Sequence, residues 1–232
     1  MPGNSSGSLA GRRVLITCAD AFMGPVTREL FEEEGAEVIA DSRDLTPGGA
    51  PAALVAEHGC PDVLIANLAA PSSPGTPVEA LEDAVWTEKF EIMVHPLFRL
   101  VQAVLPGMKE RRSGKVVVYG SATGLRSMAG VSAYSAARAA QVGFVKAAGL
   151  EAAPHNVQIN LIAQNYVENP DYYPPELVET ERFQKHLSRN VPAGRLATGR
   201  EDAQLARFLA SNESDFIVGQ SIAFSGGWTL QG

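Results

Sequence analysis

A tyrosine and an arginine lie four residues apart in the stretch SAYSAARAA, as Tyr134 and Arg138. On a helix this spacing places both side chains on one face, one turn apart. A guanidinium beside a phenol stabilises the phenolate and therefore lowers the pKa of the tyrosine. Tyr134 would then act as a general base near neutral pH, or as an acid in the reverse direction.

A serine, Ser121, precedes Tyr134 by thirteen residues and follows the apolar run VVVYG. It stands at the end of an expected buried strand, where its hydroxyl could hydrogen-bond the same substrate oxygen as the tyrosine. Each of these side chains alone is more commonly a packing residue or part of a solvated helix face. The spacing of Ser121, Tyr134 and Arg138 together favours a catalytic set.

Apolar runs rich in β-branched residues alternate with helical patterns along the whole chain, which predicts strands separated by helices. The expected strands cover residues 12–17, 36–41, 61–67, 114–121, 157–163 and 220–227. The expected helices cover residues 25–35, 51–58, 81–111 (interrupted near Pro96 and Pro106) and 134–151. This repetition predicts an α/β fold: a single Rossmann-like, doubly wound parallel sheet with helices on both faces.

In such a sheet, ligands bind beyond the carboxyl ends of the strands. We therefore expect the functional site at residues 17–24, 67–71, 121–126 and 164–173. The whole chain, 1–232, is expected to be one domain. Residues 1–11 would be a flexible lead-in, and residues 164–188 an insertion that forms a wall or lid of the substrate site.

Composition excludes several classes of partner. The net charge is −7 and no basic stripe is present, so neither nucleic acid nor a membrane is an expected partner. No apolar stretch has membrane-spanning length and the N-terminus lacks a signal-peptide core, which predicts a soluble, cytoplasmic protein. Cys18 and Cys60 are expected to be reduced thiols. The four histidines lack metal-ligand spacing, so no metal site is expected.

The layout resembles the short-chain dehydrogenase/reductase superfamily over nearly the whole chain. Dehydrogenases of that superfamily carry lysine where this chain has Arg138. The Ser–Tyr–Arg variant resembles the halohydrin dehalogenases, which also carry a Thr–x4–Phe/Tyr–x–Gly motif near the N-terminus. The stretch TCADAFMG supplies that motif, from Thr17 through Phe22 to Gly24.

This resemblance implies that the ancestral dinucleotide site has been lost. A dinucleotide-binding turn needs glycines so that backbone amides can approach the pyrophosphate. The superfamily's Thr-Gly-x-x-x-Gly-x-Gly has Cys18 at its first glycine and Phe22 at its second, and only Gly24 remains. The ring of Phe22 is expected to fill the phosphate or nicotinamide space, so no cofactor is expected. Alternatively, Phe22 packs in the core and a relaxed loop still admits NAD.

A halohydrin dehalogenase converts vicinal halohydrins to epoxides with release of halide and a proton, and opens epoxides with azide, cyanide or nitrite. Its partners would be a small halohydrin or epoxide and an anionic nucleophile, and the family's assembly is a homotetramer. The halide or nucleophile site implied by the resemblance comprises Thr17, Phe22, Gly24, Gln164, Asn165, Tyr166 and Val167.

The insertion after the last inner strand supplies further candidates. Tyr172 and Tyr173 either line the substrate side of the pocket or pack the insertion. Glu168 and Asp171 are expected to face outward, because a carboxylate against a halide would be unfavourable.

Two other functions stay open. One is an NAD(P)-dependent short-chain oxidoreductase in which Arg138 replaces the lysine. The other is a non-catalytic sensor or scaffold. The glycine-poor turn argues against the first, and the intact spacing of the serine, tyrosine and arginine argues against the second.

Overall fold

Within residues 7–71 and 75–230, which the computed structural model describes, six parallel strands form one sheet. The strands are β1 (Arg13–Thr17), β2 (Glu37–Asp41), β3 (Val63–Asn67), β4 (Gly114–Ser121), β5 (Val157–Gln164) and β6 (Ser221–Phe224). Their order is β2-β1-β3-β4-β5-β6, so the direction of winding reverses at β1. The predicted doubly wound, Rossmann-like fold is confirmed.

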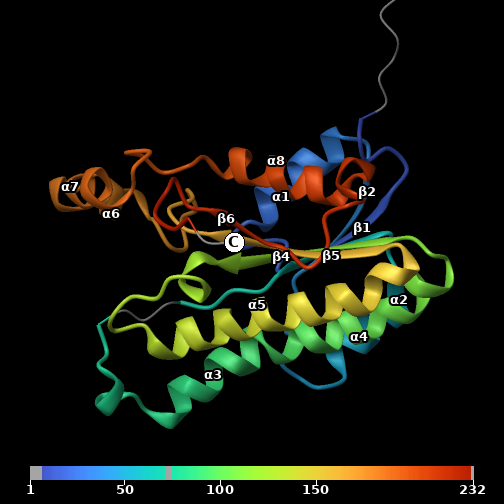
Figure 1. Ribbon diagram of the computed structural model, residues 1–232, viewed down its shortest axis with the longest axis horizontal. Helices are drawn as coiled ribbons and strands as arrows, with labels where there is room; N and C mark the ends of the chain where they lie inside the picture. The colour runs from blue at the N-terminus through green and yellow to red at the C-terminus, as the bar shows by residue number, and fades with distance from the viewer. Residues whose placement is uncertain (1–6, 72–74, 231–232) are drawn as a thin grey trace, which may run out of the picture.

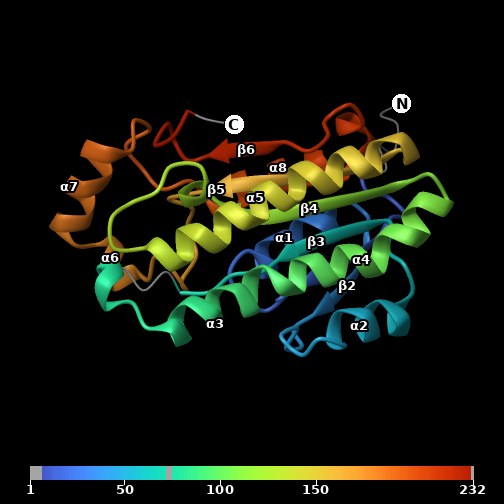
Figure 2. The same ribbon diagram turned by 60° about the horizontal axis from the view of Figure 1, so that its bottom comes forward.

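Helices cover both faces of this sheet (Figure 1). They are α1 (Gly24–Glu33), α2 (Ala50–His58), α3 (Asp83–Met93), α4 (His95–Glu110), α5 (Ser132–Ala152), α6 (Pro175–Val178), α7 (Glu181–Asn190) and α8 (Gly199–Ala210). The helices α2, α4 and α5 lie on one face, and α1 and α8 lie on the other. Figure 2 shows α5 running alongside α3 and α4, while α6 and α7 extend beyond the carboxyl ends of the strands.

The central strand β4 illustrates how the core is built. All of its residues are buried, as its run of valines predicts for a strand covered on both faces. Val116 and Val118 pack toward α4 and α5, whereas Val117 and Tyr119 pack toward α1 and α8. This alternation follows from the two-residue period of a strand, and it sets the carboxyl end of β4 between both helical layers.

The helical predictions differ from the structure in two places. The expected helix over residues 81–111 divides into two helices near Pro96, which lacks a backbone donor and stands in the first turn of α4, but the interruption expected near Pro106 is absent, since α4 continues through that residue. The helices α6, α7 and α8 lie where no helix was expected. The start of α8 is fixed by a capping box, in which Thr198 Oγ1 accepts from Glu201 N and Glu201 Oε2 accepts from Thr198 N.

Part of the expected flexible lead-in packs against the domain. Leu9 is fully buried, and the backbone N–H of Ser8 donates to Glu34 Oε2 at 2.8 Å. Residues 1–6 of that prediction lie outside the described residues. In the described part of the chain, no helix is both long and apolar enough to cross a membrane.

Candidate active site

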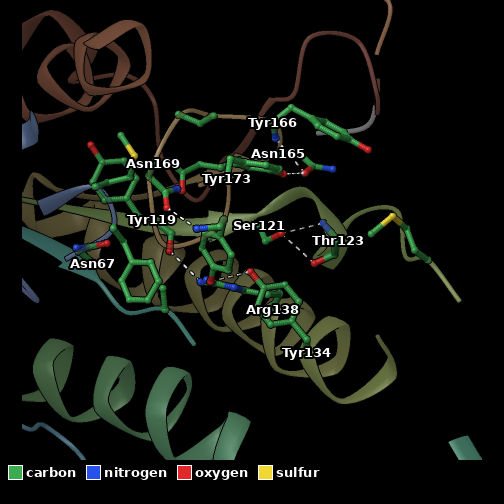
Figure 3. Close-up of a pocket in the computed structure, with 18 residues that line it drawn as sticks. Asn67, Tyr119, Ser121, Thr123, Tyr134, Arg138, Asn165, Tyr166, Asn169 and Tyr173 are labelled. Atoms are coloured by element: carbon green, nitrogen blue, oxygen red, sulfur yellow. Dashed lines mark hydrogen bonds between the residues drawn. The ribbon is translucent and has the colours of Figure 1, made fainter. Parts of the chain in front are cut away.

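A cavity of about 120 Å³ opens beyond the carboxyl ends of the inner strands, where the strand order reverses. Figure 3 shows Ser121, Tyr134 and Arg138 on one side of it and Asn165 and Tyr173 on another. The lining residues are Phe22, Met23, Asn67, Ala69, Tyr119, Gly120, Ser121, Thr123, Met128, Tyr134, Arg138, Gln164, Asn165, Tyr166, Val167, Asn169, Tyr172 and Tyr173. Pockets for drug-sized ligands measure about 300–1,000 Å³, so this cavity suits a smaller molecule.

Ser121 is the last residue of β4, and its hydroxyl is fixed by the turn that follows. Its Oγ accepts from the backbone N–H of Thr123 at 3.2 Å and lies 2.9 Å from Thr123 Oγ1. The turn lies close against α5, since a Cβ on Gly124 would come within 2.8 Å of the Arg138 backbone. A glycine at that position therefore lets Ser121 approach the helix that carries the tyrosine.

Tyr134 and Arg138 lie one turn apart on α5, as their spacing predicts. The guanidinium carbon of Arg138 is 5.1 Å from the centroid of the Tyr134 ring. Arg138 is buried, and its Nη1 donates to Leu68 O, Tyr119 O and Gln141 Oε1 at 3.0, 3.1 and 3.0 Å. These acceptors on β4, α5 and the segment after β3 hold the cation against the phenol.

The environment of Tyr134 suits it to proton transfer. Burial raises the pKa of its phenol, whereas the positive charge of Arg138 lowers it. Hydrogen bonding with Arg138 and Ser121 lowers this pKa further. The lowering effects outweigh burial, so the pKa of Tyr134 lies below its ordinary value, as the sequence predicts.

A second tyrosine, Tyr172, extends from the insertion into the cavity. Its hydroxyl donates to Ala70 O at 2.7 Å and lies 3.5 Å from the hydroxyl of Tyr134. Its ring contacts that of Phe22, with centroids 5.3 Å apart. Burial raises the pKa of the Tyr172 phenol, which stays neutral and available as a hydrogen-bonding group. Tyr172 therefore joins the β1–α1 turn to the side of the cavity that carries Tyr134.

Asn165 and Tyr173 form the opposite wall. Asn165 Oδ1 accepts from Tyr166 N at 3.0 Å and from the Tyr173 hydroxyl at 3.3 Å. These two donors fix the orientation of the Asn165 amide. Its Nδ2 is buried and has no hydrogen-bond partner within the described ranges. An unpaired buried donor beside a cavity is suited to receive an acceptor from a ligand.

The turn between β1 and α1 is the place where a dinucleotide would have to bind. Cys18 and Phe22 adopt left-handed conformations there, with φ of 45° and 52°, although both carry side chains. Asn67 Nδ2 donates to Cys18 O and Ala21 O at 2.9 Å each, which holds the turn closed. The backbone N–H of Phe22 donates to Asp171 Oδ2 at 2.7 Å.

The carboxylate of Asp171 therefore lies just before α1, where a helix N-terminus would otherwise attract a phosphate. Its negative charge opposes an anion, and it takes up an amide that a pyrophosphate would need. The ring of Phe22 adds bulk at the same place. The residues present thus do not fit a dinucleotide. Asp171 was expected to face outward only, and although it is exposed, it anchors the insertion to the turn.

The structure brings together most of the residues singled out from the sequence. Thr17 and Gly24 do not line the cavity. The hydroxyl of Thr17 is buried, where it accepts from Asn67 N at 3.0 Å, and Gly24 packs closely against the backbone of Cys18. Both residues therefore support the β1–α1 turn from the side that faces away from the cavity.

Several lining residues were not predicted from the sequence, including Asn67, Tyr119, Thr123 and Met128. Asn67 and Thr123 fall inside the strand-end segments expected to carry function. Their position in those segments was the feature of the sequence that could have identified them as lining residues. Among the described residues, no group of three or more His, Cys, Asp or Glu side chains could hold a metal ion.

Comparison with known proteins places this chain in a family. Residues 10–229 match the family model described as enoyl-(acyl carrier protein) reductase. The 3-oxoacyl-[acyl-carrier-protein] reductase FabG of Vibrio harveyi is 30% identical over 247 residues, covering 95% of this chain and 98% of that protein. The chain belongs to the short-chain dehydrogenase/reductase superfamily. The superfamily predicted from the sequence is thereby confirmed.

Among solved structures, one named "Dehalogenation enzyme" is 31% identical to this chain. It has a TM-score of 0.88, with 95% of this chain and 99% of that chain covered. A halohydrin dehalogenase bound to ethyl (2S)-oxiran-2-ylacetate has a TM-score of 0.83 at 24% identity, covering 95% and 98%. At that identity the likeness to the second structure concerns the fold alone.

Proposed function

We propose that this protein closes vicinal halohydrins to epoxides, with release of halide and a proton, and needs no cofactor. One observation carries the proposal: the Ser121, Tyr134 and Arg138 set faces a small cavity that ends at Phe22 and the turn closed by Asp171. The 31% identity to a protein named "Dehalogenation enzyme", over nearly the full length of both chains, supports it.

The substrate hydroxyl would lie between Ser121 Oγ and the Tyr134 phenol. Tyr134, as a phenolate beside Arg138, takes the hydroxyl proton. The resulting alkoxide oxygen attacks the neighbouring carbon, and the carbon–halogen bond breaks with its electron pair on the halide. Holding oxygen, carbon and halogen in line supplies much of the acceleration. Tyr134 then loses the proton to solvent. In the reverse direction an anion attacks and Tyr134 protonates the opening epoxide.

The departing halide requires N–H donors and apolar contacts. The unpaired Nδ2 of Asn165 is such a donor, because its amide is already oriented by Tyr166 and Tyr173. The ring of Phe22 supplies apolar surface on the same cavity. We therefore place the halide on the side of the cavity formed by residues 164–167 and Phe22.

A nicotinamide-dependent oxidoreductase is the second candidate. The match to an enoyl-(acyl carrier protein) reductase family and the FabG reductase at 30% identity favour it. Further FabG reductases match at 30–31% identity. The closed turn and the Asp171 carboxylate argue against it, since both oppose a dinucleotide.

Halide release from a small bromoalcohol, measured in nucleotide-free buffer, distinguishes the two candidates. We expect bromide and protons in equal amounts from the wild-type protein, and a rate about 10²–10⁴ lower from Tyr134→Phe. NADPH and NADH are titrated in parallel by cofactor fluorescence. Saturable nucleotide binding without bromide release would replace the proposal with the second candidate.

A further inference from the structure

A buried carboxyl group, that of Asp202, lies directly behind the wall of the cavity. Asp202 belongs to the first turn of α8, and its side chain is fully buried. Its Oδ2 accepts a hydrogen bond from Gln164 Nε2, and Gln164 lines the cavity. Its Oδ1 is buried and, in the described part of the chain, has no hydrogen-bond partner. Ionising a carboxyl group in this position is costly, because the resulting charge would be buried and only partly hydrogen-bonded.

The charged neighbours of Asp202 on α8 are paired with other residues. Arg200 donates to both carboxylate oxygens of Glu33 on α1. Glu201 accepts from both terminal nitrogens of Arg195 at 2.7 Å. These pairs lie at the protein surface, so they leave the charge of an ionised Asp202 without a compensating cation.

On the sheet side of Asp202, within the described residues, one titratable group faces the carboxyl. It is Tyr119 of β4. The Tyr119 hydroxyl shares a 2.7 Å hydrogen bond with Thr27 Oγ1 of α1, and burial raises the pKa of this phenol, so it stays neutral. Burial likewise raises the pKa of Asp202 to about 7, which the hydrogen bond from Gln164 only partly offsets. The carboxyl therefore changes charge near neutral pH.

We propose that Asp202 couples anion binding in the cavity to its own protonation, so that an anion is taken up with a proton and is released when Asp202 ionises. This inference rests on the proposed function, which places a halide beside residues 164–167. Gln164 is the link, because one side of its amide contacts the carboxyl while the residue itself forms part of the cavity wall.

The size of the coupling follows from electrostatics. Two negative charges separated by one glutamine side chain and its hydrogen bond, about 7 Å, repel enough at an effective dielectric constant near 20 to weaken binding about fifty-fold. Screening and relaxation reduce this factor, so we expect a change of about ten- to fifty-fold. Below neutral pH the site would hold halide or a nucleophilic anion, and above it the site would release halide faster.

Calorimetric titration with sodium bromide tests this coupling. For wild type, the dissociation constant should rise about five- to eightfold between about pH 6 and about pH 8, and by the full ten- to fifty-fold only at about pH 10, above the pKa of Asp202 in the anion-bound state. Titrations in two buffers with different ionisation enthalpies should show uptake of protons on bromide binding near neutral pH. Asp202→Asn keeps an acceptor for Gln164 but cannot ionise, and its affinity should not change with pH.

Tyr134 on the opposite side of the cavity also titrates, and it supplies the matched control. Tyr134→Phe should retain the pH dependence of bromide binding, because its phenyl ring leaves Asp202 unchanged. A slope that vanishes in Tyr134→Phe would assign the coupling to Tyr134 and overturn the role of Asp202.

The outcomes separate this inference from the proposed function. Wild-type bromide binding that is independent of pH, or a slope that persists in Asp202→Asn, overturns the coupling, while bromoalcohol turnover by the same preparation leaves the proposed function standing. No bromide binding at any pH, together with no halide release, overturns both. Proton uptake is measured on wild type, so near-zero uptake refutes the coupling even where Asp202→Asn fails to fold.

Discussion

The charge of Arg138 is the part of the proposed mechanism whose removal has a calculable effect. The guanidinium carbon lies 5.1 Å from the centroid of the Tyr134 ring. Two unit charges at that separation interact by about 3 kcal/mol at an effective dielectric constant near 20. In Arg138→Met this stabilisation of the phenolate is absent. The phenolate fraction at neutral pH, and with it the rate of halide release, should fall about a hundredfold.

The same substitution also has a structural cost that must be measured. Three acceptors, Leu68 O, Tyr119 O and Gln141 Oε1, would lose their guanidinium donor. Each buried acceptor left unpaired costs about 1–3 kcal/mol, so Arg138→Met should be several kcal/mol less stable. Urea unfolding and circular dichroism establish the conditions under which the variant is folded. Arg138→Lys is the matched control, since it keeps a positive charge but has fewer donors.

The assay is the initial rate of bromide release as a function of pH, from about pH 6 to about pH 10. In Arg138→Met the rising limb of the profile should move to higher pH, because the pKa of Tyr134 is no longer lowered by a cation. Arg138→Lys should lie between wild type and Arg138→Met. A folded Arg138→Met protein with the wild-type rate and profile would refute the role of the guanidinium.

Three further changes have defined outcomes. Tyr134→Phe should lower halide release by about 10²–10⁴, the usual contribution of a general base, with an unchanged circular dichroism spectrum, and a retained rate would remove Tyr134 from the mechanism. The double change of Phe22→Gly and Asp171→Asn should increase affinity for NADPH, measured by fluorescence. Tight NADPH binding by wild type would show that the turn is not closed to nucleotides. For Asp202, the folded-state pKa of about 7 lies above the unfolded value near 3.8, so its contribution to stability is lost as pH rises from about 4 to about 7. Asp202→Asn should therefore be up to about 4 kcal/mol more stable than wild type at pH 8, relative to their difference at pH 4, by urea unfolding. An unchanged difference would contradict the burial argument.

The parts of the site that were predictable depend on local patterns. The valine run of β4 identifies a strand buried on both faces, and Ser121 follows at its end. The spacing of Tyr134 and Arg138 places them together on any helix, so their contact needs no knowledge of the tertiary fold. The turn at Phe22 was recognisable because glycine is missing where a dinucleotide requires it.

The contacts that were missed join residues far apart in sequence. Asp171 and the Phe22 amide are 149 positions apart, and Gln164 and Asp202 are 38 apart. No periodicity relates such pairs, and acidic side chains are usually exposed, so Asp171 was expected only to face solvent. The helix α8 was overlooked although Thr198 and Glu201 carry a capping-box signature. Recognition of that helix would have placed Asp202 in its first turn, close to the end of β5.

The bond between Asp171 and the Phe22 amide has a practical consequence for redesign of the pocket. Tyr172, which limits the space beside Tyr134, is the next residue in the chain and shares that anchor. For the proposed epoxide substrates, replacing Tyr172 alone should create room for bulkier molecules while the loop stays bonded to the β1–α1 turn. Shortening or exchanging the whole loop would instead remove the hydrogen bond between Asp171 and the Phe22 amide, and with it a constraint on the β1–α1 turn. Libraries aimed at larger substrates should therefore vary position 172 and hold Asp171 constant.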